Sequence, residues 1–234
     1  MSPDITAVVL AAGQGRRMGG TNKALLPLAG RPVLHYSMTA FAQCPSVAQL
    51  ILVMNDADVL RLQEQWQMTP ADLGADLVVP GGAERWLSSL AGCQMAEHAV
   101  VLVHDAARAL ITASTIEAVA AATRKHGAAL AAHPLADTLK REAAGGKVAE
   151  TVARENLWCA QTPQGFKRDL LLRAFTHWQQ NHDHLPTDEA MLAEAAGIAP
   201  MLVAAPSSNF KLTTPADLAL AESLLHVAAS TDHA

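Results

Sequence analysis

The chain has 234 residues, half of them hydrophobic, and a formal net charge of −5. This length is sufficient for one domain with a substantial core, and we expect a single domain over residues 1–234. The negative charge argues against a nucleic-acid polymer as partner, and no apolar stretch reaches the roughly 18 residues that a membrane helix needs.

Short apolar runs alternate with longer amphipathic segments, which is typical of an α/β protein. The predicted strands are Ala7–Leu10, Gln49–Met54, Asp76–Val79, Val100–Val103, Ala128–Ala132 and Met201–Ala204. The predicted helices are Pro32–Ala42, Ala57–Trp66, Arg85–Ala96, Ser114–His126, Asp169–Gln179, Asp188–Ala196 and Pro215–Val227, with Pro32 at a first helical position and Thr187 and Thr214 as candidate N-caps. We expect a Rossmann-like, mostly parallel twisted sheet with helices on both faces.

Residues 136–154 do not fit this alternation. Two short extended pieces flank Gly145-Gly146, a pair that suits a tight turn. The segment predicts a polar β-hairpin that projects from the α/β body, either as a mobile loop or as a dimerisation arm.

A glycine-rich stretch follows the first predicted strand. It reads Ala11-Ala12-Gly13-Gln14-Gly15-Arg16-Arg17-Met18-Gly19-Gly20, with Lys23 just beyond. Glycine lets backbone N–H groups approach phosphate oxygens closely, and the arginines and the lysine add positive charge. Met18 stands where a G-x-G-x-x-G dinucleotide motif needs its third glycine, and no Gly-Lys-Ser/Thr of a Walker A loop follows. The stretch predicts a polyanion site of another kind; the alternative is an ordinary glycine-rich turn.

Leu10 to Met18, together with Lys23, resembles the opening motif of the sugar-nucleotidyltransferase superfamily. Later stretches resemble one branch of it, the 2-C-methyl-D-erythritol 4-phosphate cytidylyltransferases. They are Gly81–Ser89, His104-Asp105-Ala106-Ala107-Arg108, Asp137–Arg141, Thr151–Arg154, Gln161-Thr162-Pro163-Gln164, Thr187–Ala190 and Asn209–Thr213. The ordered series covers nearly the whole chain, and it implies a nucleotide-diphospho-sugar transferase type of fold.

The resemblance implies a reaction in which a polyol phosphate attacks the α-phosphorus of CTP and expels pyrophosphate. It places Arg17 and Lys23 on the CTP phosphates, and Arg154 and Lys211 on the incoming phosphate, side by side. The other nucleotide-binding residues that it implies are Ala11, Ala12, Gly13, Gly15, Gly82, Arg85, Ser88 and Ala106. The other polyol-binding residues are Asp105, Arg108, Thr138 and Thr187, with a homodimer joined through the 136–154 arm.

Asp105 stands at the carboxyl end of a predicted strand, where open α/β sheets bind their ligands. Its carboxylate is therefore the predicted ligand of Mg²⁺ or another divalent cation, and a helix cap is the alternative. His104 beside it is predicted to be structural. Arg85 and Arg108 have an alternative as surface ion-pair partners, and Lys211 has one as a solvated surface residue.

Three residues depart from the family pattern: Ala83, Ala109 and Ala153. The alternative functions are a ribitol 5-phosphate cytidylyltransferase and a regulatory homologue that has lost catalysis. The three cysteines are odd in number and widely separated, which argues against disulfides and favours a reducing cytoplasm.

Overall fold

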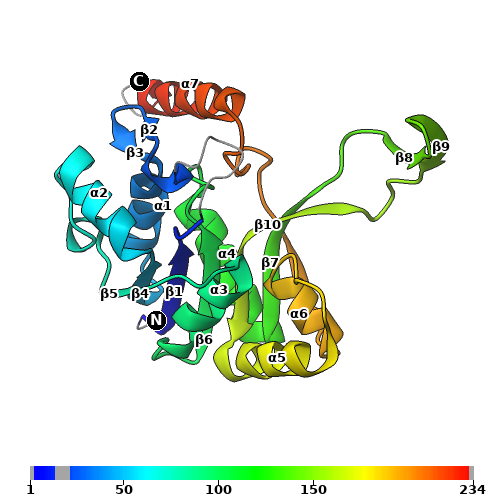
Figure 1. Ribbon diagram of the computed structural model, residues 1–234, viewed down its shortest axis with the longest axis horizontal. Coiled ribbons are helices and arrows are strands. Elements are labelled where there is room, and N and C mark those ends of the chain that lie inside the picture. The colour runs from blue at the N-terminus through cyan, green and yellow to red at the C-terminus, as the bar shows by residue number, and fades with distance from the viewer. Residues whose placement is uncertain (1–2, 14–21, 232–234) are drawn as a thin grey trace.

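The centre of the protein is a seven-stranded sheet with the strand order β11-β7-β10-β6-β1-β4-β5 (Figure 1). The structure is a computed structural model that describes residues 3–13 and 22–231. The strands are β1 Ile5–Leu10, β4 Val47–Val53, β5 Leu77–Val79, β6 Val100–Asp105, β7 Ala128–Pro134, β10 Trp158–Lys167 and β11 Met201–Ala204. β10 is antiparallel to β6 and β7, and every other neighbouring pair is parallel.

Helices pack on both faces of this sheet (Figure 1). The helices of these two layers are α1 Val33–Ala42, α2 Asp56–Trp66, α3 Arg85–Gln94, α4 Ala113–His126, α5 Arg168–Asn181 and α6 Glu189–Ala195. The last helix, α7 Pro215–Thr231, lies outside the two layers and packs against Leu28 and Val33 (Figure 1). Two 3₁₀ turns, η2 Lys23–Leu25 and η3 Ala71–Leu73, and a small ribbon of β2 Pro27–Leu28 with β3 Arg31–Pro32 complete the body. Within the described ranges, no helix is long and apolar enough to cross a membrane.

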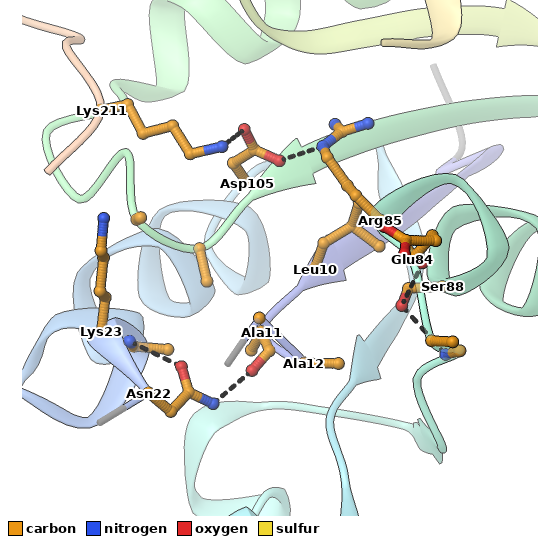
Figure 2. A pocket seen from close by; sticks show the side chains of 16 residues that line it. Leu10, Ala11, Ala12, Asn22, Lys23, Glu84, Arg85, Ser88, Asp105 and Lys211 are labelled. Carbon is orange, nitrogen blue, oxygen red and sulfur yellow. Dashed lines mark hydrogen bonds and ion pairs between the residues drawn. The ribbon is translucent and has the colours of Figure 1, made fainter. Parts of the chain in front are cut away.

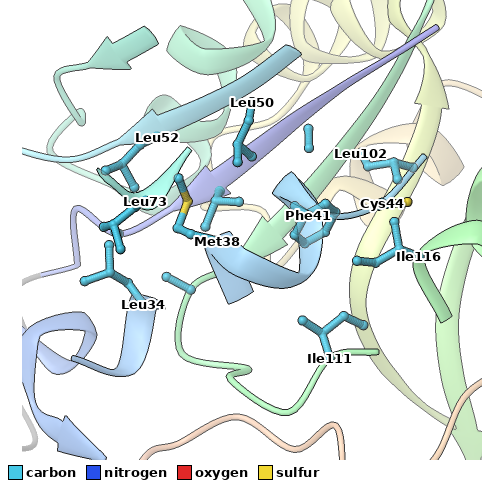
Figure 3. Packing of buried hydrophobic residues seen from close by; sticks show 14 of the residues in the cluster. Leu34, Met38, Phe41, Cys44, Leu50, Leu52, Leu73, Leu102, Ile111 and Ile116 are labelled. Carbon is cyan, nitrogen blue, oxygen red and sulfur yellow. The ribbon is translucent and has the colours of Figure 1, made fainter. Parts of the chain in front are cut away.

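The side chains of β1 show how the sheet divides the core. Ile5, Ala7 and Val9 pack into a cluster with residues of α1, α2 and α4, part of which is drawn in Figure 3. Val8 and Leu10 point the other way, into a cluster with residues of α3, α5 and α6. A strand that is buried on both faces is a continuous apolar run in the sequence, because alternate side chains enter two different cores. The predicted α/β class, with a mostly parallel sheet between two helical layers, is confirmed.

The six predicted strands and seven predicted helices are all present, with ends that differ by a few residues. Two local predictions are wrong. Pro32 is the N-cap of α1, which begins one residue later. Asp188 rather than Thr187 caps α6, because its carboxylate accepts a backbone N–H of the first turn at 2.9 Å. Thr214 does cap α7, since its hydroxyl accepts the N–H of Asp217 at 3.3 Å.

Strand β10 was not predicted from the sequence. Its middle carries polar residues and Pro163, which lacks the N–H that a ladder needs. The pairing with β7 accommodates this by shifting register between Ala160 and Gln164. A proline inside a polar stretch reads as loop in the sequence, so only the neighbouring strands identify this segment as part of the sheet.

The predicted hairpin is present as β8 Leu139–Ala143 and β9 Lys147–Val152, which pair only with each other in the described part of the chain. Gly145 and Gly146 form its turn with positive φ angles of 79° and 75°, which glycine adopts without strain. The hairpin extends away from the body (Figure 1). Nearly all of its residues are exposed, so its packing inside one chain does not explain its length.

Candidate active site

A cavity of about 390 Å³ opens at the carboxyl ends of β1 and β6. It is lined by residues 10–13 after β1, residues 22–24, residues 82–85 with Ser88, residues 105–107 after β6, and Lys211. These segments are far apart in the sequence, and the sheet brings them together because parallel strands end at the same edge. Figure 2 shows Lys23 and Lys211 on one side of the cavity and Glu84 and Ser88 on the other.

Most of the predicted site residues line this cavity. They are Ala11, Ala12, Gly13, Lys23, Gly82, Arg85, Ser88, Asp105, Ala106 and Lys211. Gly15 and Arg17 lie outside the described residues. Arg108, Thr138, Arg154 and Thr187 do not line the cavity within one chain.

The loop before α3 forms one wall. The N–H of Gly82 donates to Ser88 Oγ at 3.1 Å, and that hydroxyl donates to the Glu84 carbonyl at 3.3 Å. A side chain at Gly81 would place its Cβ 2.1 Å from the Cβ of Ala12, which is too close for two carbon atoms. Glycine therefore lets this loop lie directly against the segment after β1, and the two segments form a continuous surface.

The opposite wall is held from behind by Asn22, which the sequence interpretation did not single out. Its side-chain amide donates to the Ala11 carbonyl at 2.6 Å and to Asp58 Oδ2 at 2.8 Å, and its Oδ1 accepts the N–H of Ala24 at 3.0 Å. Asn22 thus fixes the end of β1 to the turn that carries Lys23. Lys23 Nζ donates to the Thr213 carbonyl at 3.2 Å, two residues from Lys211.

Asp105 lies at the end of β6 between two cations (Figure 2). Its Oδ1 accepts from Arg85 Nε at 2.9 Å, and its Oδ2 accepts from Lys211 Nζ at 2.7 Å. Burial alone would raise the pKa of Asp105, but Arg85 and Lys211 outweigh it and hold the pKa well below the usual range. Asp105 is therefore ionised at neutral pH.

Arg85 binds a second carboxylate on its far side. Its Nη1 and Nη2 donate to the two oxygens of Glu189 at 2.8 and 3.1 Å. Burial lowers the pKa of Arg85, but Asp105 and Glu189 together outweigh burial and raise it. Arg85 is thus an ion-pair partner, as the alternative interpretation had it, although the pair lies in the cavity wall rather than on an open surface. Glu189 is fully buried. It belongs to the family-like stretch Thr187–Ala190, but hydrophobic periodicity alone does not distinguish it from a surface glutamate.

The carboxylate oxygens of Asp105 could act as ligands of a divalent cation that also binds the phosphates of a substrate. An ionised carboxylate has about four lone-pair positions, and Arg85 and Lys211 use two of them. In the described part of the chain no group of three or more His, Cys, Asp or Glu side chains is placed to hold a metal. Such a site suits Mg²⁺, which commonly uses one or two carboxylates and takes its remaining ligands from phosphate and water.

His104 lies immediately behind Asp105, fully buried. Its Nε2 lies 3.3 Å from the Arg108 carbonyl, which can only accept, so Nε2 carries the proton. Its Nδ1 accepts from the Thr162 hydroxyl at 3.0 Å, and the same hydroxyl oxygen accepts the Asp105 N–H at 3.1 Å. This network orients Asp105 through its backbone, in agreement with the structural role predicted for His104.

The four predicted residues outside the cavity have other contacts. Arg108 Nη1 donates to the Asn209 carbonyl at 2.8 Å and so ties the segment after β6 to the stretch that carries Lys211. Thr138 and Arg154 are exposed at the base of the hairpin, where Arg154 Nη1 donates to the Ala136 carbonyl. Thr187 is exposed, and its hydroxyl contacts a methionine sulfur in α6. The expected proximity of Arg154 to Lys211 is therefore not formed at this cavity by one chain alone.

Residues 5–227 match the family model of 2-C-methyl-D-erythritol 4-phosphate cytidylyltransferase. Among its relatives is a bifunctional enzyme IspD/IspF of Desulforudis audaxviator, 42% identical over 95% of this chain. Another is a 2-C-methyl-D-erythritol 4-phosphate cytidylyltransferase of Symbiobacterium thermophilum, 40% identical over 94% of this chain. The chain spans 57% of the length of the first relative and 92% of the second. A crystal structure of the cytidylyltransferase of Thermus thermophilus superposes with a TM-score of 0.78 at 30% identity, covering 94% of this chain and 98% of that one.

Proposed function

The chain belongs to the 2-C-methyl-D-erythritol 4-phosphate cytidylyltransferase family, and we propose that it transfers the cytidylyl group of CTP to 2-C-methyl-D-erythritol 4-phosphate. The products are 4-diphosphocytidyl-2-C-methyl-D-erythritol and pyrophosphate, in the non-mevalonate route to isoprenoid precursors. The observation that supports this most is the convergence of Lys23, Lys211, Asp105 and the segment from Gly82 to Ser88 on one cavity.

In this reaction a phosphate oxygen of the polyol phosphate forms a bond to the α-phosphorus of CTP. The bond from that phosphorus to the bridging oxygen breaks, and its electron pair leaves with pyrophosphate. The attacking oxygen is already anionic near neutral pH, so the protein needs no general base for it. Catalysis then depends on alignment of the two phosphates and on neutralisation of their charge.

The two lysines suit these two tasks. Lys23, with Arg17, binds the CTP phosphates and stabilises the charge that builds up on them. Lys211 holds the polyol phosphate in line, because its ammonium has three N–H donors and Asp105 accepts only one of them. Mg²⁺ bound to the CTP phosphates, with Asp105 as its protein ligand, would supply further positive charge.

The base of the nucleotide binds at the end of the cavity opposite the two lysines. Ser88 lies there, away from Lys23 and Lys211 (Figure 2), and its hydroxyl accepts the N–H of Gly82. The resemblance of residues 82–88 to the cytosine pocket of the family, which has little room for a purine, supports a pyrimidine at this end.

We further propose a homodimer in which the 136–154 arm of each chain completes the polyol site of its partner. Two observations support it: the hairpin is almost fully exposed, with Val148 at 63% exposure, and Thr138 and Arg154 lie outside the cavity of their own chain.

The Lys211→Ala and Arg154→Ala variants, each of low activity alone, test whether the arm acts across the dimer. If the arm acts across the dimer, mixing the two weak variants creates one intact site per mixed dimer and restores activity. No recovery after subunit exchange contradicts the arrangement.

The activity is tested by pyrophosphate release with each nucleoside triphosphate and a panel of polyol phosphates. We expect CTP to be used well above UTP, ATP and GTP, and 2-C-methyl-D-erythritol 4-phosphate above ribitol 5-phosphate. Similar turnover with ATP refutes the cytidylyltransferase assignment, and CTP binding without turnover indicates the regulatory alternative. We also propose a cytoplasmic location, and the three free thiols of Cys44, Cys93 and Cys159 support it.

A further inference from the structure

We propose that Glu189, a buried glutamate that does not line the cavity, is a positioning residue for cytidylyl transfer. The inference rests on the proposed function. Glu189 acts through a row of three further side chains, Arg85, Asp105 and Lys211. Lys211 is the member of this row that we assign to the polyol phosphate.

The position of Glu189 is fixed by burial and by the contacts at the start of its helix. It is the first residue of α6, and its side chain is 0% exposed. Gln164 of β10 fixes the start of α6. Its Nε2 donates to Asp188 Oδ2 at 2.9 Å, and its Oε1 accepts the N–H of Ala190 at 2.8 Å. The carboxylate therefore has a fixed position relative to the sheet, and β6 with Asp105 belongs to the same sheet.

The geometry of Arg85 transmits that position. A guanidinium group is planar and rigid, so two of its nitrogens held by Glu189 fix the direction of the third. The third nitrogen, Nε, donates to Asp105 Oδ1 at 2.9 Å. With Oδ1 fixed in this way, Oδ2 is directed to Lys211 Nζ at 2.7 Å. Four side chains thus form a row of alternating charge that leads from the interior to the cavity.

The charge of Glu189 also determines which cation in the wall is available to phosphate. Arg85 lines the cavity, but its charge is balanced by Glu189 and Asp105. Lys211 has one carboxylate contact and its side chain is 40% exposed, so it retains donors for a ligand. Without the negative charge of Glu189, Arg85 would carry excess positive charge beside the cavity and would attract phosphate to a position away from Lys211.

Glu189→Gln is therefore expected to lower kcat without weakening CTP binding, a combination that loss of stability alone does not produce. The substitution keeps the shape of the side chain and removes its charge. We expect kcat to fall roughly 10- to 100-fold, because the groups that align the phosphates are displaced. The Kd for CTP, measured by calorimetric titration, is expected to stay the same or decrease, because the cavity wall becomes more positive.

Glu194→Gln is the matched control, since Glu194 is exposed on the same helix. All variants are compared with wild type for pyrophosphate release, CTP binding and urea unfolding. A folded Glu189→Gln variant with kcat within twofold of wild type overturns the inference. A variant in which kcat and CTP binding decline together, in proportion to the loss of folded protein, shows a merely structural role and also overturns it.

A second comparison is needed because Glu189→Gln leaves Arg85 with Asp105 as its one carboxylate partner among the contacts described above, and the loss of half of this ion-pair arrangement can itself destabilise the fold. The double variant Glu189→Gln, Arg85→Gln removes both charges and is compared with Arg85→Gln. If Glu189 acts through Arg85, the double variant has the same kcat as Arg85→Gln. A further tenfold loss in the double variant contradicts the proposed route. Failure of wild-type protein to release pyrophosphate from CTP would instead refute the proposed function, so the two failures are distinguishable.

Discussion

Replacing Lys211 by alanine removes the cation that we assign to the polyol phosphate. Lys211 lines the cavity, and its Nζ lies 2.7 Å from Asp105 Oδ2. Two unit charges about 4 Å apart interact with about 4 kcal/mol at the effective dielectric constant of a protein surface. The side chain is 40% exposed, so we halve this figure for solvent screening to about 2 kcal/mol. The kcat/KM for the polyol phosphate is then expected to fall roughly 30-fold.

The loss should be confined to the second substrate. Asp105 keeps its ion pair with Arg85 in the variant, so its carboxylate stays ionised and the wall toward the base stays in place. The Kd for CTP is therefore expected to change by less than threefold.

Initial rates of pyrophosphate release at saturating CTP, with the polyol phosphate varied, give the first quantity, and a CTP titration gives the second. Lys125→Ala is the control, because Lys125 is exposed in the last turn of α4 and does not line the cavity. A loss of less than threefold in kcat/KM, or a 30-fold loss of CTP affinity, would refute the role assigned to Lys211.

Three further outcomes are expected. Lys23→Ala lowers kcat about a hundredfold and raises KM much less, because its charge acts mainly in the transition state; steady-state kinetics within twofold of wild type would show that it is dispensable. Gly92→Ala lowers the free energy of unfolding by about 2 kcal/mol, since the new Cβ would lie 2.4 Å from Val8 Cγ1; an unchanged thermal midpoint would mean that α3 shifts without cost. Burial raises the pKa of the Cys44 thiol to about 11, so at about pH 8 it resists a thiol reagent that modifies Cys159, and equal rates of labelling would contradict this.

Strands that are buried on both faces were predicted correctly because their apolar residues form a local pattern in the sequence. Ile5–Leu10 and Val100–Asp105 are buried on both faces, so each appears in the sequence as an apolar run of strand length. β10 lacks that signal because polar residues and Pro163 interrupt it. Its place between β6 and β7 depends on pairing with segments that are distant in the sequence, and such pairing leaves no local pattern.

The candidate site divides in the same way. Ala11–Gly13, Lys23, the segment from Gly82 to Ser88 and Asp105 could be identified because small residues and charges at the ends of predicted strands are local features. Arg108 and Thr187 carry suitable groups, yet one is bound to a backbone carbonyl and the other faces solvent outside the cavity. Side-chain chemistry alone does not tell which direction a residue faces.

The sequence by itself therefore determined the α/β class, the hairpin and most of the residues that line the cavity. Only the tertiary structure decided how their charges are paired. Arg85 binds Asp105, 20 residues away, and Glu189, 104 residues away, so its charge is balanced, while Lys211 and Lys23 line the cavity as well. The physical reason is that a charge removed from water must have a partner, and the packing of α6 against the sheet determines which partner lies within reach.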